Sequence, residues 1–242
     1  MRLKKDYLGA VSERVLSSRS VDVNPSLMCE ACVDVLPVDG AGISLVQKSL
    51  RVPLGWSSPA VGVAERAQTT VGTGPCLSAA EAGSALAAGE RVIADRWPVY
   101  WGELQRLTSF RSVASIPLSV GDDAPFGALD LYADEAGLTP TLALPDLTAS
   151  VAEPIAVMLS GAFARLYDEE VGVPDWLTED PAVGRVAVWT AVGMVVGSSE
   201  QDDLDALATL RGWAYSHGLS LDEVADRLVE RDLPVEAVLG DS

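Results

Sequence analysis

The spacing of the apolar residues changes once along this chain of 242 residues, and that change constrains the fold more than any other feature. Between residues 40 and 133, short strand-like runs alternate with helical patterns and with turns rich in Gly and Pro. After residue 145 the apolar residues recur every three or four positions, which is the spacing of an amphipathic helix. We therefore expect an α+β sheet domain that is followed by a purely helical part.

The first part of the chain predicts about five strands with intervening helices. Asn24 and Pro25 form a typical helix start, because Asn suits the N-cap and Pro suits the first turn. The turn cluster at 121–125 favours a hairpin between its two flanking strands. The segment 59–70 shows no clear period and is expected to be loose. The predicted helices are 1–20, 25–36, 75–89 and 97–108, and the predicted strands are 42–46, 50–57, 91–95, 112–120 and 126–133.

The second part predicts helices with well-marked ends. An apolar stripe runs from Leu147 to Leu166, and an acidic linker follows at 166–180. From residue 181 we expect three short helices: the first ends at Gly197, a new cap forms at Ser198–Ser199, and a capping box opens the last at Ser220–Glu223. The expected organisation is a sheet domain over 1–165, the linker, and a helical domain over 181–242.

Composition places the chain in a reduced, cytoplasmic setting. It carries 17 Lys and Arg against 35 Asp and Glu, a formal charge of −18, which disfavours polybasic membrane binding and simple attraction to nucleic acid. No run of about 18 apolar residues predicts a membrane span, and the N-terminus lacks the apolar core of a signal peptide. Three cysteines, an odd number, provide no disulfide framework.

Two segments resemble known families. Residues 40–135 resemble a GAF domain of the actinobacterial kind, through GISLV, VGTGPCLSAAEAG, RVIAD followed by WP, SFRSVASIPLSV and FGALDLYA. Residues 184–232 resemble an ANTAR domain, through AVGMVVG and LATLRGWAYSHGLSLDEVADRLVER in that order. The order GAF then ANTAR is itself a known arrangement, and the fold class implied is a GAF-like antiparallel sheet with flanking helices plus a three-helix ANTAR-like domain.

The resemblance implies a sensor that feeds a regulator. ANTAR domains bind paired stem-loops in nascent mRNA leaders and prevent a terminator from forming, usually as dimers. GAF domains usually hold a small ligand on one face of the sheet. RNA contacts fall on Ala191 and Gly193 of the first helix and on Arg211 and Tyr215 of the second. An arginine binds phosphate or stacks on a base, and a tyrosine four residues later offers a stacking platform on the same helix face.

The ANTAR-like segment departs from the family in charge. Val192 stands where relatives commonly carry a lysine, and residues 181–242 contain four basic and eleven acidic side chains, a net charge of −7. An RNA-binding surface needs the opposite sign. The alternative is a GAF sensor dimer whose ANTAR-like module docks to protein rather than to RNA. In that case Arg211 pairs with Asp205 or Glu223, and Tyr215 packs in the core.

A ligand pocket in the sheet domain, if present, has aromatic candidates and one thiol. They are Trp56, Cys76, Trp97, Tyr100, Trp101 and Phe110. The alternative is that these aromatic residues are simply core. Cys76 follows a Gly-Thr-Gly-Pro turn at a predicted helix start, where a helix dipole stabilises a thiolate, so it is either a redox or covalent sensor or a buried turn residue.

The sequence offers few residues for metal binding, phosphate binding or catalysis. Cys29 and Cys32 lack the further ligands that a metal site requires and are expected to be core residues, and the single histidine, His217, is expected to serve at a helix end. The Gly-Thr-Gly at 72–74 lacks the Lys and Ser/Thr of a phosphate-binding loop. We find no catalytic residue set and no metal site, the cofactor is unknown, and the expected partners are RNA, an unidentified small molecule and a second copy of the chain, with no membrane.

Overall fold

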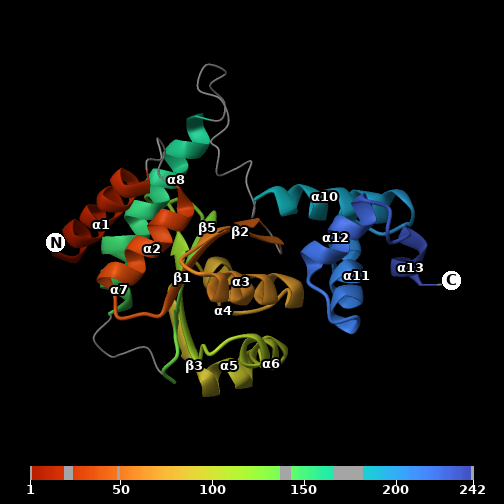
Figure 1. Ribbon diagram of the computed structural model, residues 1–242, viewed down its shortest axis with the longest axis horizontal. Helices are drawn as coiled ribbons and strands as arrows, with labels where there is room; N and C mark the ends of the chain where they lie inside the picture. Colours follow the sequence, from red (N-terminus) through yellow and green to blue (C-terminus); the bar gives the residue numbers. More distant parts are fainter. Residues whose placement is uncertain (1, 19–23, 48–49, 137–142, 166–181, 241–242) are drawn as a thin grey trace.

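The computed structural model describes residues 2–18, 24–47, 50–136, 143–165 and 182–240. A five-stranded sheet lies between two sets of helices, and a separate bundle of helices packs beside it (Figure 1). Helices α1 and α13 lie at opposite ends of the molecule. The predicted linker at 166–180 lies outside the described residues.

The sheet is antiparallel throughout, with the strand order β2-β1-β5-β4-β3. Its strands are β1 (Gly40–Gln47), β2 (Leu50–Trp56), β3 (Leu86–Gly89), β4 (Ser112–Leu118) and β5 (Gly127–Ala133). The central position of β5 explains why its residues are buried on both faces.

One face of the sheet carries the main apolar core. Alternate residues of the central strands, such as Ile43, Ile116 and Leu129, point to this face, as the two-residue period of a strand requires. The helices that cover it come from the two ends of the sheet domain. They are α1 (Arg2–Ser18), α2 (Pro25–Val35), α7 (Leu144–Leu147), the π-helical turn η1 (Thr148–Ala152) and α8 (Glu153–Arg165).

The opposite face of the sheet is covered by the helices between β2 and β4. Their apolar residues form a second cluster with Val113 and Tyr132 of the sheet. The helices are α3 (Pro59–Val71), α4 (Pro75–Ala82), α5 (Glu90–Arg96) and α6 (Pro98–Leu107). This face also carries polar side chains, which form the site described below.

The C-terminal bundle, here called the helical unit, has its own core. Residues such as Val188, Leu207 and Leu228 are fully or almost fully buried within it. Its helices are α10 (Ala182–Gly197), α11 (Asp203–Ser216), α12 (Leu221–Val229) and α13 (Val235–Leu239). The helical unit contacts the sheet domain through α3 and β2, and Val52 of β2 packs against its core.

Most of the predicted elements are confirmed. Asn24 caps α2 by accepting a hydrogen bond from the Ser26 amide, and the Ser220–Glu223 capping box is present in both directions. The mixed architecture with an antiparallel sheet and flanking helices agrees with the predicted fold class. Cys29 and Cys32 are buried in the main core, as expected.

The prediction that 59–70 is loose was wrong, because these residues form α3. Ser58 caps the helix, Pro59 occupies its first turn, and Gly72 ends it in the left-handed conformation. Buried polar residues such as Glu65 and Gln68 interrupt the apolar stripe that would reveal a helix. Their partners come from distant strands, so a local pattern could not identify them.

Four further features differ from prediction. The expected helix over 75–89 ends at Gly83, and its last residues form strand β3, whereas the expected strand at 91–95 is helix α5. Pairing with β4 determines this outcome, since short apolar runs fit either structure. Asp202, rather than Ser198–Ser199, caps α11, and the short helix α13 gives the helical unit a fourth helix.

One segment among the described residues, Leu144–Ala164, is long and apolar enough by length and composition to cross a membrane. It comprises α7, η1 and most of α8 and includes Asp146 and Glu153, so it is not a continuous apolar run. Half of its most apolar window is buried against the rest of the protein, as in a core helix.

Replacing Ser220 by Ala is expected to destabilise the helical unit by about 1 kcal/mol, because it removes the hydroxyl that caps α12. Urea unfolding followed by circular dichroism measures the change. Ser12→Ala is the matched control, since the Ser12 hydroxyl is exposed and bonds only within α1, to the Leu8 carbonyl. Equal unfolding curves for the two variants would contradict the capping role.

Candidate functional site

The face of the sheet below α3 holds a buried polar cluster that centres on Arg51 of β2. Its members come from four strands and two helices, and all of them have 0% exposed surface. The period of two places the strand members opposite the apolar face, because they alternate along their strands with residues of the main core. The buried polar cluster consists of Ser44, Arg51, Glu65, Gln68, Thr69, Cys76, Ser115, Asp130 and Tyr132.

Arg51 joins two carboxylates from different elements. Its Nη2 forms a very short ion pair with Oε2 of Glu65 on α3 and lies 2.8 Å from Oδ2 of Asp130 on β5. Its Nη1 donates to the Glu65 carbonyl at 2.8 Å. Removal of one partner of a buried pair like this typically costs about 3–5 kcal/mol, because the other charge stays in the interior.

The two carboxylates are bonded further. The Tyr132 hydroxyl donates to Oε1 of Glu65 at 2.7 Å, and the Ser115 hydroxyl donates to Oδ1 of Asp130 at 2.5 Å. Gln68 uses both ends of its amide: Nε2 donates to Asp130, and Oε1 accepts from the Cys76 backbone at the start of α4. The cluster therefore ties α3 and α4 to the sheet.

Charge is not balanced within the cluster, because one guanidinium faces two carboxylates. Burial of the carboxyl, followed by the nearby Glu65, raises the pKa of Asp130 to about 6, and Arg51 opposes this rise. Burial likewise raises the pKa of the Cys76 thiol, which Arg51 only partly offsets. Cys76 is thus held as a buried neutral thiol, against the hypothesis of a stabilised thiolate.

The C-terminal end of α3 receives the helical unit. Nε of Arg211 on α11 donates to the Thr69 carbonyl at 3.1 Å, and the backbone amide of Leu221 donates to Oγ1 of Thr70 at 3.1 Å. The last carbonyls of a helix and the first amides of the next lack partners within their own helices. Each contact therefore satisfies a helix end, one of α3 and one of α12.

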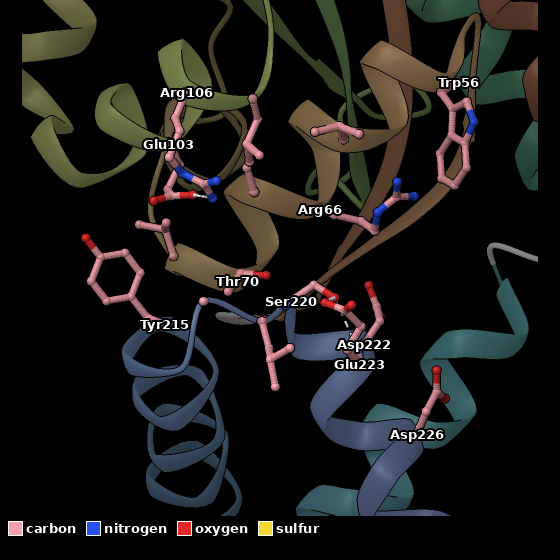
Figure 2. Close-up of a pocket in the computed structure, with 16 residues that line it drawn as sticks. Trp56, Arg66, Thr70, Glu103, Arg106, Tyr215, Ser220, Asp222, Glu223 and Asp226 are labelled. Carbon is pink, nitrogen blue, oxygen red and sulfur yellow. Dashed lines mark hydrogen bonds and ion pairs between the residues drawn. The ribbon is translucent and has the colours of Figure 1, made fainter.

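A groove of about 620 Å³ lies along this junction (Figure 2). Arg66 of α3 and Arg106 of α6 enter it from the sheet domain, whereas Tyr215, Glu223 and Asp226 line it from the helical unit. Arg106 pairs with Glu103 at 2.6 Å and Arg66 lies over the Trp56 ring. Hydrogen bonds from Ser220 to its carboxylate lower the pKa of Glu223.

The predicted ligand-pocket aromatics lie together, but mostly in the interior. Tyr100 is fully buried, Trp97 and Phe110 are 4% exposed, and Trp101 is partly buried against the same cluster. Trp56 packs there too and also borders the groove, whereas Cys76 belongs to the buried polar cluster. The structure thus places these residues beside the groove or in the apolar cluster between α3, α6 and the sheet.

The predicted RNA-binding residues are separated by the structure. Ala191 is fully buried in the helical unit, whereas Gly193 lies on an exposed face of α10. Arg211 is partly buried against α3, and Tyr215, with 52% of its surface exposed, lines the groove. Arg211 thus contacts the Thr69 carbonyl of α3. His217 ends α11 and stacks on Trp213.

Of the buried polar cluster, sequence reasoning identified only Cys76. The signal was present in the strands, where Ser44, Ser115 and Asp130 alternate with apolar neighbours. The long-range pairing of Arg51 with Glu65 and Asp130 carries no local signal. Among the described residues, no group of three or more His, Cys, Asp or Glu side chains could hold a metal ion.

Comparisons with known proteins find likeness at the level of fold. No family model and no curated protein matches. Solved structures that match include the GAF domain of a phosphoenolpyruvate-protein phosphotransferase from Coxiella burnetii (14% identity, TM-score 0.48, 67% of this chain and 97% of that one) and its Acinetobacter counterpart (11%, 0.44, 65% and 94%). A free methionine-R-sulfoxide reductase from Thermoplasma acidophilum also matches (14%, 0.39, 66% and 96%). Likeness this distant assigns no ligand or activity.

The raised pKa of Asp130 predicts a pH dependence of stability. The folded protein binds this proton near pH 6 and the unfolded chain near pH 4, so the contribution is complete below about pH 4 and is lost as the pH rises through 6. We expect this group to make the wild type roughly 1 kcal/mol more stable at pH 5 than at pH 7. Urea unfolding at both pH values, with Asp130→Asn and the exposed Asp226→Asn as variants, measures it. Only Asp130→Asn is expected to lose the difference, and its retention there would disprove the assignment.

Gly72→Ala is expected to loosen the helical unit. A Cβ at Gly72 would lie 2.8 Å from Nη1 of Arg211, so the guanidinium must leave the Thr69 carbonyl. Small-angle X-ray scattering should show a larger radius of gyration. Gly83→Ala is the matched control, because Gly83 also ends a helix at positive φ but has no atom within 4 Å of its added Cβ. The same radius for both variants would rule out the effect of Arg211.

Proposed function

We propose that this chain is a ligand-responsive regulator of transcription antitermination, which binds paired stem-loops of an mRNA leader through its helical unit. The sheet domain is the small-molecule sensor, and the regulator acts in the cytoplasm as a homodimer. The proposal rests on the GAF-like and ANTAR-like sequence segments. It describes a binding protein, not an enzyme.

The observation that carries the proposal is the position of Arg211. This residue is the strongest RNA-contact candidate of the helical unit, and its Nε donates to the Thr69 carbonyl of the sheet domain. Arg211 is partly buried against α3, so in the docked state α3 covers part of the side chain that RNA would contact. Docking to the sheet domain and binding to RNA are therefore competing states, which gives the sensor control over RNA binding.

A second candidate function follows from charge. The helical unit carries a net charge of −7 over 181–242, and in this structure it already docks to protein surface, through α3 and β2. In this alternative the unit is a protein-docking module that no longer binds RNA. The two functions differ in their response to a two-hairpin RNA.

Arg211→Ala is expected to weaken RNA binding about tenfold, the loss typical of one arginine contact. Gel-shift titrations of the full chain with a two-hairpin leader RNA, over a range of salt concentrations, measure this loss. Arg227→Ala is the control, because Arg227 is an exposed arginine of α12. Absence of binding at low salt by the folded chain would support the protein-docking alternative.

Gly72→Ala is expected to act in the opposite direction. By releasing Arg211 from α3 it makes the guanidinium available, so RNA binding should become tighter, while Gly83→Ala should leave it unchanged. The same gel-shift titration measures both variants. Weaker binding by Gly72→Ala would contradict competition between docking and RNA.

A further inference from the structure

Helix α3 touches the buried polar cluster and the helical unit with adjacent residues. Towards the sheet it presents Glu65, which pairs with Arg51, and Gln68, which donates to Asp130. Towards the helical unit it presents the Thr69 carbonyl and the Thr70 hydroxyl. A displacement of α3 relative to the sheet therefore changes both sets of contacts.

Thr69 of α3 contacts two arginines, Arg51 of the sheet and Arg211 of the helical unit. Its hydroxyl lies 3.5 Å from Nη1 of Arg51 and donates to the Glu65 carbonyl at 3.0 Å. Its carbonyl accepts from Arg211. Arg51 and Arg211 thus contact the same residue of α3, Arg51 at the Thr69 hydroxyl and Arg211 at the Thr69 carbonyl.

We propose that the charge state of the Asp130–Glu65 pair controls how firmly the helical unit docks, with α3 as the connecting element. This coupling goes beyond the proposed function, because it concerns docking and holds whether or not the helical unit binds RNA. In this proposal, proton binding in the buried polar cluster changes the strength of the contact between the sheet domain and the helical unit.

The charges around Asp130 set the direction of the effect. The ionisable groups that face it are Arg51 of β2, Glu65 of α3, Cys76 of α4, Tyr100 of α6 and Tyr132 of its own strand. Burial raises the pKa of the thiol and of both phenols, so these three are neutral near pH 6. One cation then faces two carboxylates, or only one after Asp130 binds a proton.

Proton binding at Asp130 strengthens the hold on α3. When Asp130 is ionised, the Arg51 guanidinium pairs with two carboxylates, Asp130 on β5 and Glu65 on α3. One cation then compensates only one of two buried negative charges. When Asp130 is neutral, the guanidinium and Glu65 form a balanced pair that joins β2 to α3. Docking should therefore tighten as the pH falls through about 6 and loosen as it rises.

The test follows the Leu221 amide, whose hydrogen bond to Thr70 reports docking directly. In ¹⁵N-labelled full-length protein without RNA, we expect its chemical shift to follow one proton-binding curve with a midpoint near pH 6. Asp130→Asn should abolish the transition. His217→Gln is the essential control and should retain it, because His217 is the single histidine of the chain and lies four residues from Leu221.

Ser115→Ala supplies a variant that keeps the Asp130 carboxyl. Loss of the 2.5 Å hydrogen bond to Oδ1, which favours the ionised form, should move the midpoint of the Leu221 transition to higher pH. A transition that persists in Asp130→Asn, or that vanishes in His217→Gln, would overturn the coupling. So would a flat Leu221 response while the Asp130 carboxyl itself titrates. Each result is independent of the gel-shift outcome.

Discussion

The fold of the sheet domain depends on the position of Arg51 between two carboxylates in the interior. Arg51 lies on an edge strand, Glu65 lies on α3 and Asp130 lies on the central strand, so the three residues fix the helix to the sheet through buried charges. The burial of a full guanidinium is tolerated because both ends of its fork find oxygen partners. Hydroxyls of Ser115 and Tyr132 satisfy the remaining carboxylate oxygens.

This arrangement also organises the rest of the molecule. Because α3 is fixed to the sheet, the Thr69 carbonyl and the Thr70 hydroxyl are positioned to bind the helical unit. The groove lies between the two parts beside these contacts. The aromatic residues of α6 and its flanking positions pack on the same face of the sheet. The contact with the helical unit and the groove beside it thus depend on the position of α3, which the two ion pairs of Arg51 help to fix.

Local sequence signals predicted elements with self-contained ends. The caps of α2 and α12 and the hairpin between β4 and β5 need only neighbouring residues, and they were predicted correctly. Helix α3 was missed because its polar residues are buried by partners 14 to 67 positions away. The aromatic residues near the site could be identified by type, but their burial could not. Arg211 was singled out for chemistry, yet its contact with Thr69, 142 positions away, has no sequence signature.

The joint between α3 and the helical unit has an evolutionary consequence. On one side of each hydrogen bond stands a backbone group, the Thr69 carbonyl, which every amino acid supplies, or the Leu221 amide, which every amino acid except proline supplies. The identity of the residue therefore matters to these two hydrogen bonds mainly at Arg211 and Thr70, which supply the side-chain partners. Substitutions at the two backbone positions can accumulate while both hydrogen bonds persist.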